Sequence, residues 1–141
     1  MSEEKTGRMA KWLSPYLWVV AIFSLLAFAA AVMPESWMIK IAFRLGIKDF
    51  PDVPLTYYLA RNLSLMYGFV AVGLLVLIRD LNRYMELVGY LALGTMAFGA
   101  GQLIVNAMSG LPIWWVVGEG GSTIFGGALM AWLQRGASAG R

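Results

Sequence analysis

The residues of this sequence that are best suited to chemistry are four polar side chains inside long apolar runs. They are Arg61, Gln102, Asn106 and Glu119. A charged side chain is costly to insert into a membrane, and an ionisable residue within a spanning helix is by default a hypothesis about function. These residue types suit an ion pair that fixes helix register, a binding site for a ligand, or a proton or cation site.

The positions of these side chains predict that they lie at similar depths. Because a helix rises about 1.5 Å per residue, Arg61 should lie about 8 Å, Gln102 about 9 Å and Glu119 about 10 Å inside the outer ends of their helices. Asn106 falls one turn from Gln102 on the same face. We therefore predict an Arg61–Glu119 ion pair within a cluster that serves as a ligand site or as a structural element. The full expected cluster is Arg61, Asn62, Gln102, Asn106, Glu119 and Ser122.

The composition predicts what kind of protein carries this cluster. The chain has 141 residues, of which 60% are hydrophobic and 13% are charged. Soluble domains are about 45–50% apolar and about 25% charged. We therefore expect an integral membrane protein with a single domain over residues 1–141. The net charge of +3 comes from basic residues that flank the apolar runs, a pattern typical of membrane orientation and not of nucleic-acid binding.

The missing residue types exclude several chemistries. The sequence contains no cysteine and no histidine. This excludes thiol catalysis, iron–sulfur clusters, histidine-ligated haem or metal, and a Ser-His-Asp triad. Apart from Tyr57, Tyr58 or Ser122, no second group stands at the depth of Glu119 to share acid–base work, and a nucleophile–base pair is lacking. We expect no enzymatic activity, no cofactor and no metal site.

Four apolar runs are close to the roughly 20 residues that a spanning helix requires. They cover residues 16–33, 56–78, 84–108 and 112–133. The links after the second and third runs are short, so neighbouring helices should be antiparallel. The expected fold is an all-α integral membrane four-helix bundle.

The basic residues predict the orientation of this bundle. With both termini in the cytoplasm, seven basic residues lie on the inner side: Lys5, Arg8, Lys11, Arg79, Arg83, Arg135 and Arg141. Only Lys40, Arg44 and Lys48 would lie outside. Since cytoplasmic links carry an excess of Lys and Arg, we expect a multi-pass protein of the bacterial inner membrane with both ends inside.

The first external link is predicted to contain a further helix over residues 35–45. Pro34 suits a helix start and Gly46 a helix stop. Lys40, Arg44 and Lys48 recur every four residues and form the expected interfacial basic face. The apolar face expected opposite to it consists of Trp37, Met38, Ile41, Ala42 and Leu45. Such a helix lies in the plane of the interface. It either covers the outer mouth of the bundle or contacts lipid or a partner.

Small residues recur every four positions on three of the predicted helices. The pairs and triplets are Ser64 and Gly68, then Ala97 and Gly101, then Gly118, Ser122 and Gly126. Small residues at this spacing allow the backbones of membrane helices to approach closely. We expect them to mediate helix packing, either within one chain or between chains.

The sequence from Pro34 onward resembles small uncharacterised four-helix bacterial membrane proteins of the BphX-like group. The similarity lies in "MPESWM", in "LGIKDFPDVPLTYYLARNLSLMYG" and in "GLPIWWVVGEGG". The resemblance implies a compact four-helix bundle with no established activity or cofactor. Arg61 and Glu119 both fall within the matching stretches.

Two functions remain open. The chain has too little mass outside the membrane for a catalytic domain, so it either binds a lipid-like or amphipathic ligand through the polar cluster or is an accessory subunit of a membrane assembly. The alternative is a small proton-coupled transporter of hydrophobic compounds that acts as a homodimer. The expected partners are membrane lipids and a membrane-protein partner or a second copy, with no nucleic acid.

Overall fold

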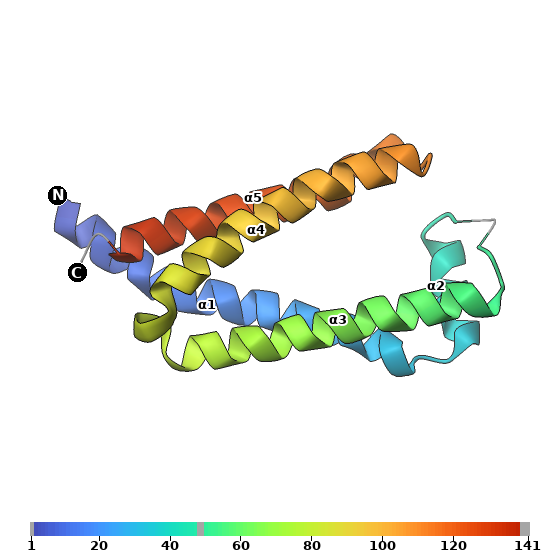
Figure 1. The fold of residues 1–141 in the computed structure, drawn as a ribbon, viewed down its shortest axis with the longest axis horizontal. Helices are drawn as coiled ribbons and strands as arrows, with labels where there is room; N and C mark the ends of the chain where they lie inside the picture. The colour runs from blue at the N-terminus through green and yellow to red at the C-terminus, as the bar shows by residue number, and fades with distance from the viewer. Residues whose placement is uncertain (1, 48–49, 139–141) are drawn as a thin grey trace. The chain divides into compact units, whose positions relative to one another are not determined.

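The computed structural model describes residues 2–47 and 50–138, with side chains from residue 11 onward. Within these residues the chain is all-α (Figure 1). Its helices are α1 (Ser2–Phe28), which continues into the 3₁₀ turn η1 (Ala29–Val32), then α2 (Glu35–Arg44), α3 (Pro54–Arg79), α4 (Leu81–Met108) and α5 (Ile113–Ser138). The first helix begins well before the predicted residue 16, and the predicted helix over residues 35–45 corresponds to α2.

Three segments are long and apolar enough to cross a membrane. They are Lys11–Val32, α3 and α4, and they correspond to the first three predicted spans. The fourth predicted span forms a continuous helix, α5, but α5 is not among the candidate spans of the described residues. Glu119 and several glycines lower the mean hydropathy of α5. The all-α class and a membrane location are therefore supported, while a bundle of four spanning helices stays a prediction.

The chain divides into two compact units. Unit 1 comprises residues 1–16 and 77–141, and unit 2 comprises residues 17–76. In unit 1, α4 and α5 pack side by side along their lengths (Figure 1). They are antiparallel, because Gln134 near the end of α5 donates to the carbonyl of Met85 near the start of α4. The first part of α1 also belongs to this unit, and it is linked to α5 by a 2.7 Å hydrogen bond from the Tyr16 hydroxyl to the Gly126 carbonyl.

Unit 2 contains the rest of α1, the helix α2 and most of α3. Met38 and Ala42, one turn apart, are the buried residues of α2. Pro34 occupies the N-cap position of this helix and Gly46, with φ of 85°, follows its end, as predicted. A positive φ favours glycine because it has no Cβ. The link into α3 is ordered by a hydrogen bond from the Tyr57 hydroxyl to Asp52 and by contact of the Tyr57 and Phe50 rings.

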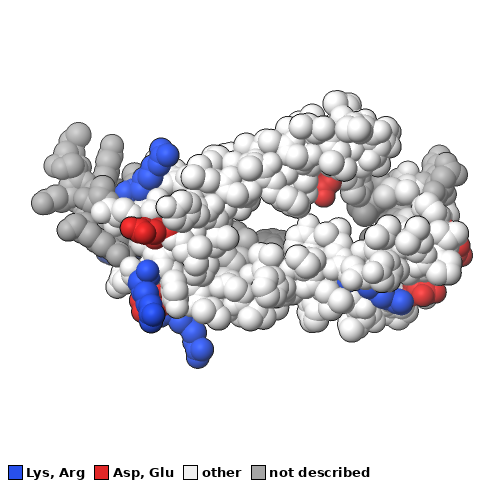
Figure 2. Space-filling view, in the orientation of Figure 1, with Lys and Arg blue, Asp and Glu red and all other residues white. Residues whose placement is uncertain are grey.

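The surface of the helices is largely uncharged. Figure 2 shows broad white areas over the helices, with basic and acidic side chains gathered near helix ends. Large apolar side chains such as Phe23, Phe69 and Phe125 are more than 60% exposed. An apolar surface of this extent is what lipid-facing helices require, because lipid chains solvate it at no cost.

Candidate functional site

The Glu119 carboxylate is the centre of a polar cluster between α4 and α5. Its Oε2 accepts hydrogen bonds from Asn106 Nδ2 at 2.8 Å and from Trp115 Nε1 at 3.1 Å, and its Oε1 accepts one from Gln102 Nε2 at 3.4 Å. We call Gln102, Asn106, Trp115 and Glu119 the Glu119 cluster. The predicted approach of Gln102 and Asn106 to Glu119 is confirmed. It follows from the helical spacing of the two amides on one face of α4.

Trp115 is a member of this cluster that the sequence prediction missed. It lies four residues before Glu119 on α5, so the two side chains occupy the same face one turn apart. The i to i+4 spacing of an indole N–H donor and a carboxylate could have identified it. Its place in the first turn of α5 also suits the membrane interface, where tryptophan is enriched.

The hydrogen-bond donors that surround the Glu119 carboxylate are all uncharged. Three N–H groups surround the carboxylate, and within the described part of unit 1 no Lys or Arg forms an ion pair with it. The Oε1 atom of Gln102 is buried and has no hydrogen-bond partner among the residues that the structure describes. Glu119 itself is exposed. The site therefore presents an exposed carboxylate, which can accept a cation or a hydrogen-bond donor.

The Ser122 hydroxyl is hydrogen-bonded to the backbone of α5 and not to the Glu119 carboxylate. Its hydroxyl donates to the Glu119 carbonyl at 3.0 Å, as the Thr123 hydroxyl does at 2.9 Å. Hydroxyls that bond to a carbonyl one turn earlier satisfy their own polarity inside a membrane helix. Ser122 thus supports the helix around Glu119, and its hydroxyl proton is engaged in this hydrogen bond to the backbone.

Arg61 and Asn62 lie in unit 2 and have other partners there. The Arg61 guanidinium lies 3.5 Å from the carboxylate of Glu35, the first residue of α2, and both side chains are about half exposed. The Asn62 amide donates to the Tyr58 carbonyl of its own helix. The ion pair ties α3 to the start of α2. Because Arg61 and Glu119 belong to different units, their predicted pairing stays a prediction.

The small residues that bring α4 and α5 together are not the ones that the four-residue spacing indicated. Ala97 is exposed, and a Cβ added at Gly101 or Gly118 would meet no atom within 4 Å. The close contacts are instead made by Gly99, Gly120 and Gly127. A Cβ at Gly99 would lie 2.9 Å from the backbone nitrogen of Ile124, and one at Gly127 would lie 2.9 Å from the Ala92 carbonyl oxygen.

These contact residues follow a seven-residue spacing. Ala92 and Gly99 on α4, and Gly120 and Gly127 on α5, are all buried. A spacing of seven is typical of helices that cross at a shallow left-handed angle, whereas a spacing of four favours steeper right-handed pairs. Within unit 1 the predicted strip is thus not the one that faces the partner helix, because sequence alone does not reveal which strip does so. Its role in packing between chains stays a prediction.

The remaining predicted packing residues contact other parts of their own units. The added Cβ at Gly126 would lie 3.3 Å from the Tyr16 hydroxyl, so this glycine allows the close approach of α1 and not of α4. Gly68 lies against the ring of Phe28, where a Cβ would come within 2.5 Å. Ser64 is buried and donates to the Ala60 carbonyl. In unit 2 the pair Ser64 and Gly68 thus lies on the packed side of α3, as predicted.

The basic face of α2 differs from the predicted arrangement. Lys40 and Arg44 are exposed, but Trp37 and Ile41 line the same surface hollow beside them instead of lying opposite. Lys40, Ile41 and Arg44 follow Trp37 by three, four and seven residues, so these four side chains lie on one stripe of α2. Only Met38 and Ala42 point to the opposite, buried side. Lys48, the third predicted basic residue, lies outside the described residues.

No family model, curated protein or solved structure matches this chain. The resemblance to the BphX-like group therefore stays a prediction.

Proposed function

We propose that this protein is a small non-enzymatic membrane protein that binds an amphipathic ligand at the Glu119 cluster, and that the ligand has a cationic head group. The observation that carries the proposal is an exposed carboxylate in an apolar helix with neutral hydrogen-bond donors as its only partners in the described part of unit 1. Beside this carboxylate, the buried Oε1 of Gln102 has no hydrogen-bond partner among the described residues.

The energetics of a membrane charge support this proposal. Neutral donors stabilise a carboxylate but leave its charge, and an isolated acidic residue at the centre of a spanning helix costs about 2.5 to 3.5 kcal/mol on insertion scales. A bound cation would offset this cost by a charge-assisted hydrogen bond. Exposed apolar side chains on the same two helices, Phe98 and Phe125, offer a surface for the hydrocarbon part of such a ligand.

We further propose that α5 is a fourth membrane span and that both termini lie in the cytoplasm of a bacterium. A helix of 26 residues is about 39 Å long, which exceeds the roughly 30 Å of bilayer hydrocarbon. Its polar residue Glu119 is hydrogen-bonded to α4, which lowers the cost of insertion. The excess of basic residues at the inner ends supports the orientation.

Native mass spectrometry with dodecylammonium as the probe tests the ligand site. The protein is purified in a non-ionic detergent and titrated with dodecylammonium or with dodecanol, which has the same chain and an uncharged head group. Wild type should bind dodecylammonium more tightly than dodecanol. Glu119→Gln should weaken dodecylammonium binding by about tenfold or more, the effect of losing one charge-assisted hydrogen bond.

Thr95→Val is the matched control. Thr95 is on α4 and its hydroxyl donates to the Leu91 carbonyl, outside the Glu119 cluster. This variant should bind like wild type. Equal binding of the two probes to wild type, or unchanged affinity in Glu119→Gln, would show that the cluster is structural and would remove the proposal.

A small proton-coupled transporter acting as a homodimer is the second candidate. It requires a glutamate that is accessible and not held in an ion pair, and within unit 1 Glu119 meets both conditions. Uptake of a fluorescent hydrophobic cation by proteoliposomes with a pH gradient separates transport from binding. Wild type should then accumulate the dye and Glu119→Gln should not. If the dye binds but is not taken up in response to the gradient, the protein binds the compound and does not transport it.

A further inference from the structure

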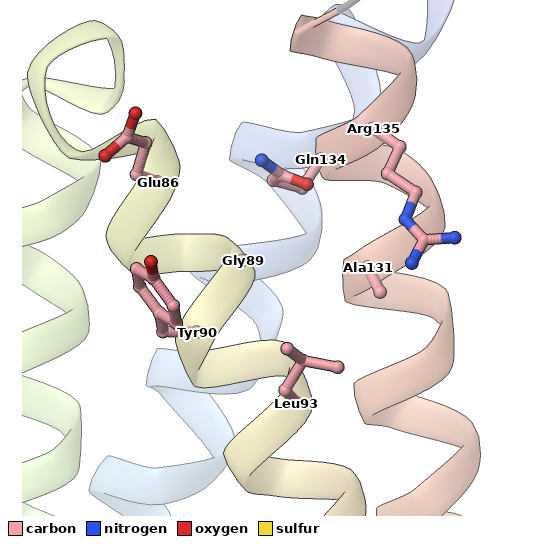
Figure 3. Close-up of a pocket in the computed structure, with 7 residues that line it drawn as sticks. All are labelled: Glu86, Gly89, Tyr90, Leu93, Ala131, Gln134 and Arg135. Carbon is pink, nitrogen blue, oxygen red and sulfur yellow. The ribbon is translucent and has the colours of Figure 1, made fainter.

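A second site lies at the other end of the α4–α5 pair, away from the Glu119 cluster. There a surface groove of about 340 Å³ opens between the start of α4 and the end of α5 (Figure 3). Glu86 and Tyr90 of α4 form one rim, and Arg135 of α5 is on the other, with Gln134 between the two helices. The groove lies entirely within unit 1.

The position of the groove matches the depth of lipid head groups. Glu86 lies five residues after the start of α4 and Arg135 three residues before the end of α5, or about 8 Å and 5 Å along the helix axes. Two exposed aromatic side chains lie about one turn farther from these helix ends: Tyr90 is 71% and Trp132 is 55% exposed. Exposed Tyr and Trp near the ends of apolar helices mark the membrane interface.

The two charged groups of the groove do not neutralise each other. Among the described side chains, neither Glu86 nor Arg135 forms an ion pair, with each other or with another residue. Asp80, the other acidic residue at this end of α4, is engaged as a helix cap and accepts from the Arg83 backbone N–H. Glu86 and Arg135 therefore offer one negative and one positive group at the two edges of the groove, and their side chains extend away from each other (Figure 3).

Gly89 and Gln134 form the floor between them. A Cβ added at Gly89 would lie 3.4 Å from the Gln134 amide, an ordinary van der Waals contact, so the Gly89 backbone lies directly beside this amide. The Gln134 amide nitrogen is held by the Met85 carbonyl and by the Ser138 hydroxyl, which fixes the floor. Leu93 extends the lining as an apolar surface in the direction of the membrane interior.

We propose that this groove binds the zwitterionic head group of a diacyl phospholipid that bears a primary ammonium, the phosphoethanolamine class. Arg135 binds the phosphate through its planar fork of N–H donors, and Glu86 accepts hydrogen bonds from the ammonium. Leu93 and the ring of Tyr90 contact the glycerol and the first methylenes of an acyl chain. The opposite charges of the two rims complement those of the head group, and the proposal does not depend on a ligand at Glu119.

Lipid retention in native mass spectrometry tests the proposal. The protein is equilibrated in nanodiscs that contain phosphatidylethanolamine, phosphatidylcholine and phosphatidylglycerol with identical acyl chains, and the lipids that remain bound after release are counted. Wild type should retain phosphatidylethanolamine preferentially. Glu86→Gln and Arg135→Gln should each lower this retention by about tenfold, as for the loss of one charge-assisted hydrogen bond. Phosphatidylcholine should bind wild type less, because its quaternary ammonium has no N–H donor.

Two controls and a conservative variant make the result decisive. Arg83→Gln removes a charge at the same end of α4 that stacks on Tyr84 outside the groove. Thr95→Val changes a side chain of α4 that lines neither the groove nor the Glu119 cluster. Both variants should retain the lipid. Arg135→Lys, which keeps the charge, replaces Arg135→Gln if the latter does not fold, and it should retain less lipid than wild type. Equal retention of the three lipids, equal losses in Arg83→Gln and Arg135→Gln, or a phosphatidylglycerol preference that is insensitive to Glu86→Gln would overturn the proposal.

Discussion

The contact between α4 and α5 gives a sharp test, because one glycine-rich helix contains two strips of small residues and only one is packed. In Gly127→Ala, the added Cβ would lie 2.9 Å from the Ala92 carbonyl oxygen and from the Met96 nitrogen. Both atoms belong to the backbone of α4 and cannot rotate away. An ordinary contact needs 3.4–4 Å, so the helices would have to separate by about 0.5 to 1 Å.

The magnitude follows from a comparison with Gly118→Ala on the same helix. Both substitutions gain the same helix propensity, about 1 kcal/mol in soluble hosts, so the difference between them isolates the steric cost. Overpacking of this kind costs about 1 to 3 kcal/mol. At Gly118 an added Cβ meets no atom within 4 Å. Gly127→Ala should therefore be less stable than Gly118→Ala by about 1 to 3 kcal/mol.

Thermal unfolding in detergent, followed by far-UV circular dichroism, measures this difference. By the scaling of soluble domains of this size, the midpoint for Gly127→Ala should lie at least about 3 °C below that for Gly118→Ala. Gly101→Ala on α4 is a second control, because its Cβ also has open space. If Gly118→Ala or Gly101→Ala melts below Gly127→Ala, the four-residue strips form the packed interface and the helix register described here is wrong.

Three further predictions concern other contacts. Tyr16→Phe removes the 2.7 Å hydrogen bond to the Gly126 carbonyl and should lower the unfolding free energy by about 1 kcal/mol, whereas Tyr90→Phe, with an exposed ring, should not change the melting midpoint. The double variant Lys40→Gln/Arg44→Gln should lower the enrichment of anionic phosphatidylglycerol around the protein in nanodiscs by about fivefold or more. The reason is that each basic residue near the membrane surface contributes about 1 kcal/mol to the attraction of anionic lipid. Unchanged enrichment would mean that α2 does not contact head groups. Because the sequence has no native cysteine, single cysteines at positions 2 and 138 report topology. Both should react with an impermeant thiol reagent from the cytoplasmic side only, and opposite accessibility would mean that α5 does not span.

Much of the fold and part of the site could be predicted because they depend on local properties. Apolar length indicated the three spanning segments, and Pro34 and Gly46 indicated the bounds of α2. The approach of Gln102 and Asn106 to Glu119 could also be predicted, since a fixed rise and turn per residue place amides one turn apart at one depth.

The partners of single charges could not be predicted in the same way. Equal depth suggested Glu119 as the partner of Arg61, but within unit 2 the guanidinium lies beside Glu35. Glu35 is distant from Arg61 in sequence and is brought to it by the turn between α2 and α3. Ion pairing depends on a few ångströms in three dimensions, and hydropathy patterns contain no such information.

The sequence by itself determined that this protein is helical, that it suits a membrane, and that one glutamate stands in an apolar helix beside two amides. Only the tertiary structure decided which strip of each helix is packed. On α5, Gly118, Ser122 and Gly126 form one strip of small residues, and Gly120 and Gly127 form another. Both strips permit close approach, and the choice between them is made by the rotation of the helix about its own axis. That rotation is set by contacts with α4 and α1, where Ala92, Met96 and Tyr16 fill the space that Gly126 and Gly127 leave.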